Sequence, residues 1–310
     1  MNSPKQLNYE TRPFKFTERK MLLASLQKIC NYYGADYQYI GLGGIAFTDF
    51  KLFHKELHID KLYSIEGGSI AKEKLEFNCP YSFINLVINK TTTALNDIPL
   101  DKKSLLWLDY DGVLDNYMFD DIDIIFRKLP IGSVYIFTCN RELKDDENNE
   151  YTTELFKKKF GNLVPFNIEN KDFSSQNNFK TIRNMFVKHI NSILRERVKI
   201  ENIKFQFCQL FNILYQENRG ARMYTFGGIL TEENFNFNDL GIKNFDFINI
   251  DEKAYNIEIP NLTRKEIDLL DSYLDKDEKE LVNKKIVTLS EFNKYKKVYK
   301  YLPQFFDVRI

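Results

Sequence analysis

The feature that most constrains the fold is a regular alternation of short apolar stretches with helical patterns in the first half of the chain. The apolar stretches cover residues 37–42, 61–66, 83–88, 104–109 and 134–138. Apolar residues at helical spacing mark the segments near 47–57, 70–77, 90–97, 117–128 and 151–160. Strands that alternate with helices in this way are typical of βαβ units. The sequence therefore predicts an α/β protein with a parallel sheet.

The rest of the chain divides into three further kinds of segment. Residues 15–33 have the spacing of a helix, and two apolar stretches at 211–218 and 221–230 predict an antiparallel hairpin. In the last part, Thr263 and Glu266 have the spacing of a capping box at a helix start. We predict an N-terminal helical segment (1–34), an α/β domain (35–230, with an insertion at about 161–200) and a C-terminal extension (231–310).

Composition excludes several classes of protein. The 310 residues include 44 basic and 44 acidic side chains, so net charge does not indicate nucleic-acid binding. The N-terminus lacks the apolar core of a signal peptide, and no apolar run has the roughly 18–20 residues of a membrane span. The four cysteines are widely spread with no C-x-x-C pair. This pattern fits reduced thiols, and we expect a cytoplasmic protein without membrane contact.

The segment Y-I-G-L-G-G-I-A-F-T-D-F, residues 39–50, places glycines between a predicted strand and a predicted helix. Glycine lets the backbone approach a ligand closely, although a tight turn without a ligand explains the same residues. Glu66 ends the next strand, 23 positions after Gly43. Rossmann-type sheets place an acid there, where it accepts the ribose hydroxyls of a nucleotide. Together, the turn and Glu66 favour a nucleotide-type cofactor.

Residues 105–115, L-L-W-L-D-Y-D-G-V-L-D, bring Asp109 and Asp111 to the end of an apolar stretch. Haloacid dehalogenase-type phosphatases place a nucleophilic aspartate and its acid/base partner in such a segment. However, Lys243 lies too close to the nearest acidic pair for that family's pattern, and the stretch is the fourth of its series rather than the first. A simple turn at Asp111 and Gly112 is the third explanation. It leaves Asp109 unexplained, because strand ends are where ligands bind in open α/β sheets.

Taken in order, these motifs resemble those of class I, S-adenosylmethionine-dependent methyltransferases. The resemblance covers about residues 36–230, through Y-I-G-L-G-G, L-Y-S-I-E, F-I-N-L-V-I with N-K-T-T-T, S-L-L-W-L-D-Y-D-G and V-Y-I-F-T. It implies a Rossmann-like, mostly parallel sheet with an antiparallel hairpin at one edge, helices on both faces and a small C-terminal helical extension. The chain is also similar to a little-characterised group of bacterial proteins that carry G-L-G-[SG], D-F-x-L-F-H-K, S-I-E and W-L-D-Y-D-G.

The resemblance implies S-adenosylmethionine as the cofactor and a role for each matching residue. Gly41 and Gly43 would contact its methionine part, with Gly44 also in the cofactor site, Glu66 would hold its ribose, and the loop Asn89–Thr92 would lie near its adenine. Asp109 would lie at the junction of cofactor and acceptor, and Asp109 or Asp111 could deprotonate or orient the accepting oxygen or nitrogen as the catalytic residue. The sequence departs from the family where Tyr39 or Ile40 replaces the usual acid, and it lacks the N-P-P-Y or D-P-P-Y of amino methyltransferases. Base-amino chemistry is therefore not expected. Carboxylates would suit a divalent metal, but no other feature supports one.

The predicted function is methyl transfer to an unidentified oxygen or nitrogen acceptor. Two alternatives stay open. One is a cofactor-binding or inactive scaffold or sensor subunit of a multiprotein system, for example in bacterial antiviral defence. The other is a magnesium-dependent phosphatase that uses Asp109 as its nucleophile. The C-terminal extension is expected to contact the acceptor or a protein partner.

Overall fold

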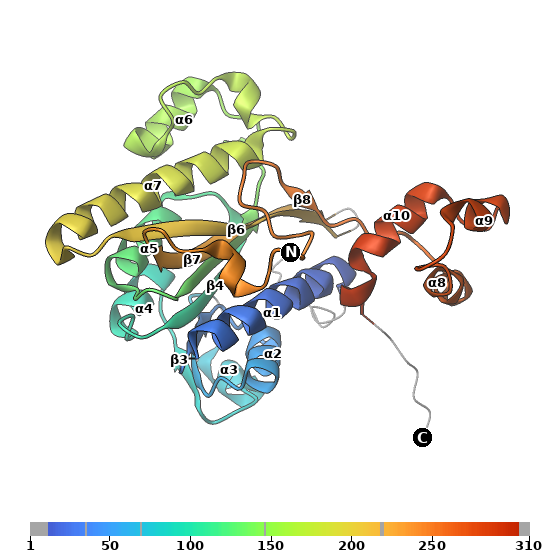
Figure 1. Cartoon of the computed structure of the whole chain (residues 1–310). Helices are drawn as coiled ribbons and strands as arrows, with labels where there is room; N and C mark the ends of the chain where they lie inside the picture. The colour runs from blue at the N-terminus through green and yellow to red at the C-terminus, as the bar shows by residue number, and fades with distance from the viewer. Residues whose placement is uncertain (1–11, 35, 69, 146, 218–219, 304–310) are drawn as a thin grey trace.

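The computed structural model describes residues 12–34, 36–68, 70–145, 147–217 and 220–303. Within these ranges the centre of the fold is an eight-stranded sheet with the order β3-β2-β1-β4-β5-β7-β6-β8 (Figure 1). The strands are β1 (Gln38–Gly41), β2 (Lys61–Ile65), β3 (Ile84–Val87), β4 (Ser104–Val113), β5 (Val134–Asn140), β6 (Phe205–Gln216), β7 (Arg222–Glu232) and β8 (Tyr255–Asn256). Strands β1 to β5 are parallel, and β7 lies antiparallel between β5 and β6. The predicted sheet, with its antiparallel hairpin, is confirmed.

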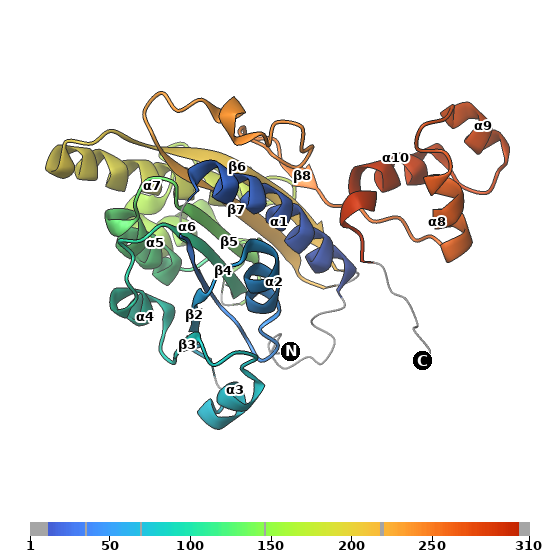
Figure 2. The same ribbon diagram turned by 60° about the horizontal axis from the view of Figure 1, so that its bottom comes forward.

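Helices cover both faces of the sheet, as predicted (Figure 2). One face carries α1 (Pro13–Tyr33) and α2 (Thr48–Leu57), and the other carries α4 (Thr91–Asp97), α5 (Asn116–Lys128) and α7 (Asn178–Glu201). The remaining helices before β6 are α3 (Lys72–Asn78) and α6 (Thr153–Phe160). Short 3₁₀ turns lie at Gly161–Leu163, Asn170–Phe173, Phe237–Leu240 and Tyr299–Tyr301. In the part of the chain that the structure describes, no helix combines the length and the apolar character needed to cross a membrane.

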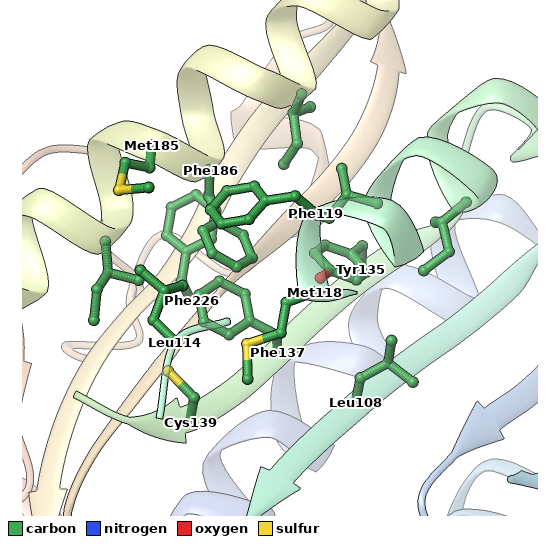
Figure 3. Packing of buried hydrophobic residues seen from close by; sticks show 14 of the residues in the cluster. Leu108, Leu114, Met118, Phe119, Tyr135, Phe137, Cys139, Met185, Phe186 and Phe226 are labelled. Atoms are coloured by element: carbon green, nitrogen blue, oxygen red, sulfur yellow. The ribbon is translucent and has the colours of Figure 1, made fainter. Parts of the chain in front are cut away.

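Two hydrophobic cores form because successive strand residues point to opposite faces of the sheet. In β4, Leu106 and Leu108 pack with α5 and α7, whereas Leu105 and Trp107 pack with α1 and α2. Figure 3 shows the first core, in which Phe137 of β5 stacks on Phe186 of α7 with ring centroids 3.9 Å apart. Helix α7 therefore shares a core with the central strands. The division of the chain into domains and an insertion stays a prediction.

The C-terminal helices extend away from the sheet in both views (Figures 1 and 2). They are α8 (Arg264–Asp271), α9 (Glu278–Asn283) and α10 (Leu289–Val298). A small core of their own contains Leu270, Leu281 and Phe292. The predicted capping box of Thr263 and Glu266 is present at the start of α8. The predicted helical extension is confirmed.

Strand β4 differs from the prediction at its carboxyl end. The strand continues to Val113, which pairs with Asn140, and a register shift separates this pair from the Asp109–Thr138 pair. The N-cap of α5 is Asp115, whose side chain accepts a hydrogen bond from the next backbone amide. A turn at Asp111 and Gly112 was therefore the wrong interpretation. The sequence alone did not show that β4 continues past Asp109. Its last residues stay in the strand because β5 extends to Asn140 and pairs with them after the bulge.

Candidate cofactor site

A cavity of about 690 Å³ opens at the carboxyl ends of β1, β2 and β4. In open α/β sheets this edge is where ligands bind, and the volume lies within the usual range for small-molecule sites. The cavity is lined by residues 42–46, 65–68, 70, 90–93, 109–112 and 117. These residues come from the ends of β2 and β4, from the loops after β1, β2 and β3, and from the first turns of α4 and α5. The cavity is therefore assembled by the order of the strands in the sheet.

Most of the predicted site residues meet in this cavity. Its lining includes Gly43, Gly44, Glu66, Thr92, Asp109 and Asp111. Two of the predicted residues, Gly41 and Asn89, do not line it. The particular role of each residue stays a prediction, but the structure brings together six that the sequence separates.

The glycine turn after β1 depends on close packing. A Cβ atom on Gly41, the last residue of β1, would clash with the hydroxyl group of Tyr39. A Cβ atom on Gly43 would clash with the Ser64 hydroxyl and lie 3.0 Å from Glu66 Oε1. Gly44 has a φ of 54°, in the left-handed region that favours glycine. The packing at Gly41 and Gly43 and the φ of Gly44 therefore favour glycine at all three positions.

Glu66 holds the glycine turn as well as facing the cavity. Its Oε1 accepts a hydrogen bond of 2.9 Å from Ser64 Oγ, and its carboxylate also accepts from the amides of Gly43 and Gly44. Burial raises the pKa of Glu66, while these hydrogen bonds oppose the shift. A carboxylate offers about four acceptor positions, so three donors leave room for about one more. Glu66 is thus built into the wall and keeps capacity for one ligand hydroxyl.

The wall after β3 is formed by the residues that follow Asn89. The Asn89 side chain is exposed, and its Oδ1 accepts from the Lys90 amide at 2.9 Å. Thr92 Oγ1 donates to Asp121 Oδ1 at 2.6 Å. Tyr110 donates to the other oxygen of Asp121 at 2.7 Å. Because Asp121 is fully buried, these two hydroxyl groups are what holds its carboxylate behind the wall, and burial raises its pKa to about 6.

Asp109 is fixed by a buried cation from the N-terminal helix. Lys15 Nζ lies 2.9 Å from Asp109 Oδ2 and 2.8 Å from Glu18 Oε2. It also lies 4.4 Å from the ring centre of Trp107. The side chains of Lys15 and Glu18 are 2% and 0% exposed, and that of Asp109 is 10% exposed. Asp111, two residues further along β4, is exposed at the rim of the cavity.

The cluster of Lys15, Glu18 and Asp109 continues into the sheet through hydroxyl groups. Glu18 Oε1 accepts a hydrogen bond from Thr225 Oγ1, which also contacts Thr138 Oγ1 at 2.7 Å. Burial raises the pKa of Glu18, and the charge of Lys15 opposes that shift. Two carboxylates and one ammonium therefore share a nearly dry site beside the cavity.

Lys15 and Glu18 were not among the residues predicted from the sequence. Both lie in the first turns of α1, on the stripe that continues with Leu22, Leu26 and Ile29. That helical spacing was the available signal, because it places two charged residues on the face that packs against the sheet. Charged residues at a helix start are more often exposed to solvent. The sequence pattern alone therefore favoured exposed positions for Lys15 and Glu18, whereas the structure buries both.

The described structure does not support a divalent metal ion at the carboxylates. Among the described residues, no group of three or more His, Cys, Asp or Glu side chains is placed to hold a metal ion. A divalent cation at Asp109 and Asp111 therefore stays an unsupported prediction.

The class of protein follows from the sheet and the cavity together. An antiparallel β7 inserted between β5 and β6, a glycine turn after β1 and a buried acid after β2 define the fold of class I methyltransferases. The Rossmann-like prediction is thereby confirmed. A family model described as "Putative O-methyltransferase" matches residues 7–310. The chain belongs to this family.

Three of the solved structures that resemble this chain are 10–13% identical to it in sequence. N-methyltransferase NodS from Bradyrhizobium japonicum WM9, in complex with S-adenosyl-L-homocysteine, is 13% identical, with a TM-score of 0.39 over 72% of this chain and 90% of that chain. A "putative S-adenosylmethionine dependent methyltransferase" from Listeria monocytogenes is 10% identical, with a TM-score of 0.38 over 67% and 99%. PigF with SAH is 13% identical, with a TM-score of 0.34 over 67% of this chain and 54% of PigF. No curated protein sequence matches the chain.

Proposed function

We propose that this protein transfers a methyl group from S-adenosylmethionine to an oxygen atom of a small acceptor. The observation that carries the proposal is Glu66, which is 8% exposed after β2 and fastened to the glycine turn in the wall of a cavity of about 690 Å³. Membership of the O-methyltransferase family supports the choice of oxygen as the acceptor atom.

The chemistry of the cavity fits this cofactor. When bound, S-adenosylmethionine supplies a methyl group attached to a positively charged sulfur. The lining contains three carboxylates, Glu66, Asp109 and Asp111, and one basic side chain, Lys90. Lys15 lies behind Asp109 and offsets part of that negative charge. A lining with more acidic than basic groups favours a ligand with positive charge.

The residues of the chain are given separate tasks in this proposal. Glu66 accepts a hydrogen bond from a ribose hydroxyl, and apolar side chains such as Ile45 and Ile65 exclude water. Asp109, held by Lys15, fixes the inner end of the site, so that reacting groups meet in a defined orientation. Asp111, exposed at the rim, accepts the proton that the acceptor hydroxyl loses and passes it to solvent.

The experiment that tests the proposal is calorimetric titration of the full chain with S-adenosylmethionine. We expect saturable binding by the wild type and about tenfold weaker binding by Glu66→Gln, because the amide loses the charged acceptor of the ribose hydrogen bond. Glu73→Gln, an exposed acid on α3, is the matched control and is expected to bind like the wild type. Absence of binding by the wild type would reject methyl transfer.

The scaffold or sensor hypothesis keeps the same fold and cavity. It gains support if the protein binds the cofactor but transfers no methyl group to a broad panel of acceptors. The separate core of α8–α10 supports a role for the C-terminal extension in contacting an acceptor or a protein partner. The four free cysteines support reduced thiols and a cytoplasmic location. A role in bacterial antiviral defence stays a prediction.

A further inference from the structure

A second cavity, of about 350 Å³, lies further along the same edge of the sheet. Its wall includes residues from the start of α1, the loop after β5, the end of β6, the start of β7, β8 and α10. Because β7 is antiparallel, its first residues meet the carboxyl ends of β5 and β6. The volume lies at the lower end of the range for small-molecule sites.

Two adjacent residues at the start of helix α1 link the surroundings of the two cavities. Phe14 lines the second cavity, and the adjacent Lys15 reaches Asp109 in the wall of the first at 2.9 Å. The same ammonium group lies 5.6 Å from the ring centre of Tyr215, another residue of the second cavity. A molecule in the second cavity therefore lies next to the inner end of the cofactor site.

The second cavity contains more positive than negative charge. It is lined by Arg141, Arg222 and Lys294, against the single carboxylate of Glu258. Lys294 pairs with Glu258 at 3.4 Å, and Arg222 pairs with Glu142, which lies outside the lining, also at 3.4 Å.

Arg141 is held in place by neutral groups. Its Nη1 donates to the backbone oxygen of Ser175 and to Asn178 Oδ1, the latter at 2.6 Å. Asn178 is 1% exposed, so the guanidinium is attached to a rigid part of α7. Burial lowers the pKa of Arg141, the charge of Glu142 opposes this shift, and the smaller effect of the Arg222 charge adds to it. Arg141 and Arg222 line the same cavity, so an anion bound there could accept hydrogen bonds from both guanidinium groups.

We propose that the second cavity binds a carboxylate or phosphate group of the methyl acceptor, so that the acceptors of this protein are small anionic molecules. That the bound molecule is a methyl acceptor rests on the proposed function. The anion site itself does not depend on methyl transfer. The anionic group would be held by Arg141 and Arg222, and the remainder of the molecule would extend past Phe14 towards the cofactor cavity. Selection of acceptors would then depend on charge at one end and on an oxygen atom at the other.

The test titrates the full chain by calorimetry with inorganic phosphate and, separately, with acetate, at an ionic strength kept constant with sodium chloride. We expect saturable binding of at least one anion in the millimolar range (about 1–10 mM), and the tighter of the two identifies the anion class. Arg222 is 41% exposed, so Arg222→Gln is expected to fold and to bind the anion about tenfold more weakly. Arg141→Gln is the second variant, with an equal or larger loss.

Arg127→Gln is the matched control, because this arginine is 52% exposed on α5 and pairs with Asp123 and Glu196 outside both cavities. It is expected to bind the anion like the wild type. The proposal is overturned if the wild type shows no saturable anion binding, or if both Arg141→Gln and Arg222→Gln bind as tightly as the wild type. Titration of the same variants with S-adenosylmethionine separates the two proposals. Anion binding without cofactor binding rejects only methyl transfer, and the reverse result rejects only the anion site.

Discussion

The two sides of the cofactor cavity are built by different forces. On one side, Glu66 accepts hydrogen bonds from Ser64 and from the amides of the glycine turn, all supplied by β2 and by the turn after β1. On the other side, Asp109 is held by the ammonium of Lys15, which comes from a helix 94 positions earlier in the chain. The first side is a local hydrogen-bonded turn, and the second is a buried ionic cluster. One site thus combines a part that depends on residues close in sequence with a part that forms only when distant segments pack together.

The largest effect is expected where the ionic side is broken. Lys15→Met leaves Glu18 and Asp109 buried without their shared cation, and we expect a loss of about 3–5 kcal/mol of unfolding free energy. Urea denaturation measures the loss, and adding Glu18→Gln should recover part of it by removing one charge. Lys28→Met, at an exposed position of α1, is the control and should stay within about 0.5 kcal/mol. An equally small effect for Lys15→Met would contradict the importance of the cluster.

Asp121 sharpens the comparison, because it is a buried carboxylate held by neutral groups rather than by a cation. Its pKa is raised to about 6 by burial, so the folded state binds a proton more tightly than the unfolded state. Its contribution to stability is present below about pH 4 and is lost as the pH rises through about 6. Over this window the shift represents roughly 2–3 kcal/mol. Denaturation at pH 4.5 and 7 should therefore show a smaller pH effect in Asp121→Asn, and an unchanged slope would show that Asp121 does not titrate there.

The hydrogen-bonded side can be broken by volume instead of charge. In Gly43→Ala the new methyl group would clash with Ser64 and press on Glu66. We expect a loss of about 1–3 kcal/mol in stability and weaker binding of S-adenosylmethionine, measured by denaturation and calorimetry. Gly68→Ala is the matched control for stability, because no atom lies within 4 Å of its added Cβ. Equal stability of the two variants would show that the turn is not tightly packed.

The smallest effect is expected from a single hydrogen bond. Ser64→Ala removes one of three donors to Glu66 and should cost about 1 kcal/mol. Since the Ser64 hydrogen bond lowers the pKa of Glu66, its removal should raise that pKa further. The Glu66 carboxylate would then become protonated at a higher pH than in the wild type. As the pH is lowered, the affinity for the cofactor would therefore begin to fall earlier in Ser64→Ala. Calorimetry across a pH series measures the shift, and coincident profiles would exclude this role of Ser64.

Local patterns were sufficient to predict the fold and one side of the site. Alternating strands and helices, the glycine turn and the spacing to Glu66 all depend on residues close in sequence, and the structure brings Gly43, Gly44 and Glu66 together. Asn89 does not line the cavity, because the turn after β3 leaves it exposed. Lys90 and the threonines that follow it line the cavity instead. Gly41 does not line the cavity, because it is the last residue of β1 and lies inside the sheet. Such shifts of one or two residues depend on where each strand ends.

By itself the sequence determined the α/β class, the parallel sheet with its hairpin, the glycine turn and the acid at the end of β2. These features follow from hydrophobic periodicity and short-range spacing, which act before distant parts of the chain meet. Only the tertiary structure decided that Lys15 pairs with Asp109, that Asp121 lies behind the cavity wall, and that Arg141 and Arg222 share a second cavity. These pairings depend on burial, because burial sets how strongly a charged group interacts with its neighbours and which partners it can reach. Burial depends on which helices pack against the sheet, and the helical spacing of Lys15 and Glu18 does not by itself decide that.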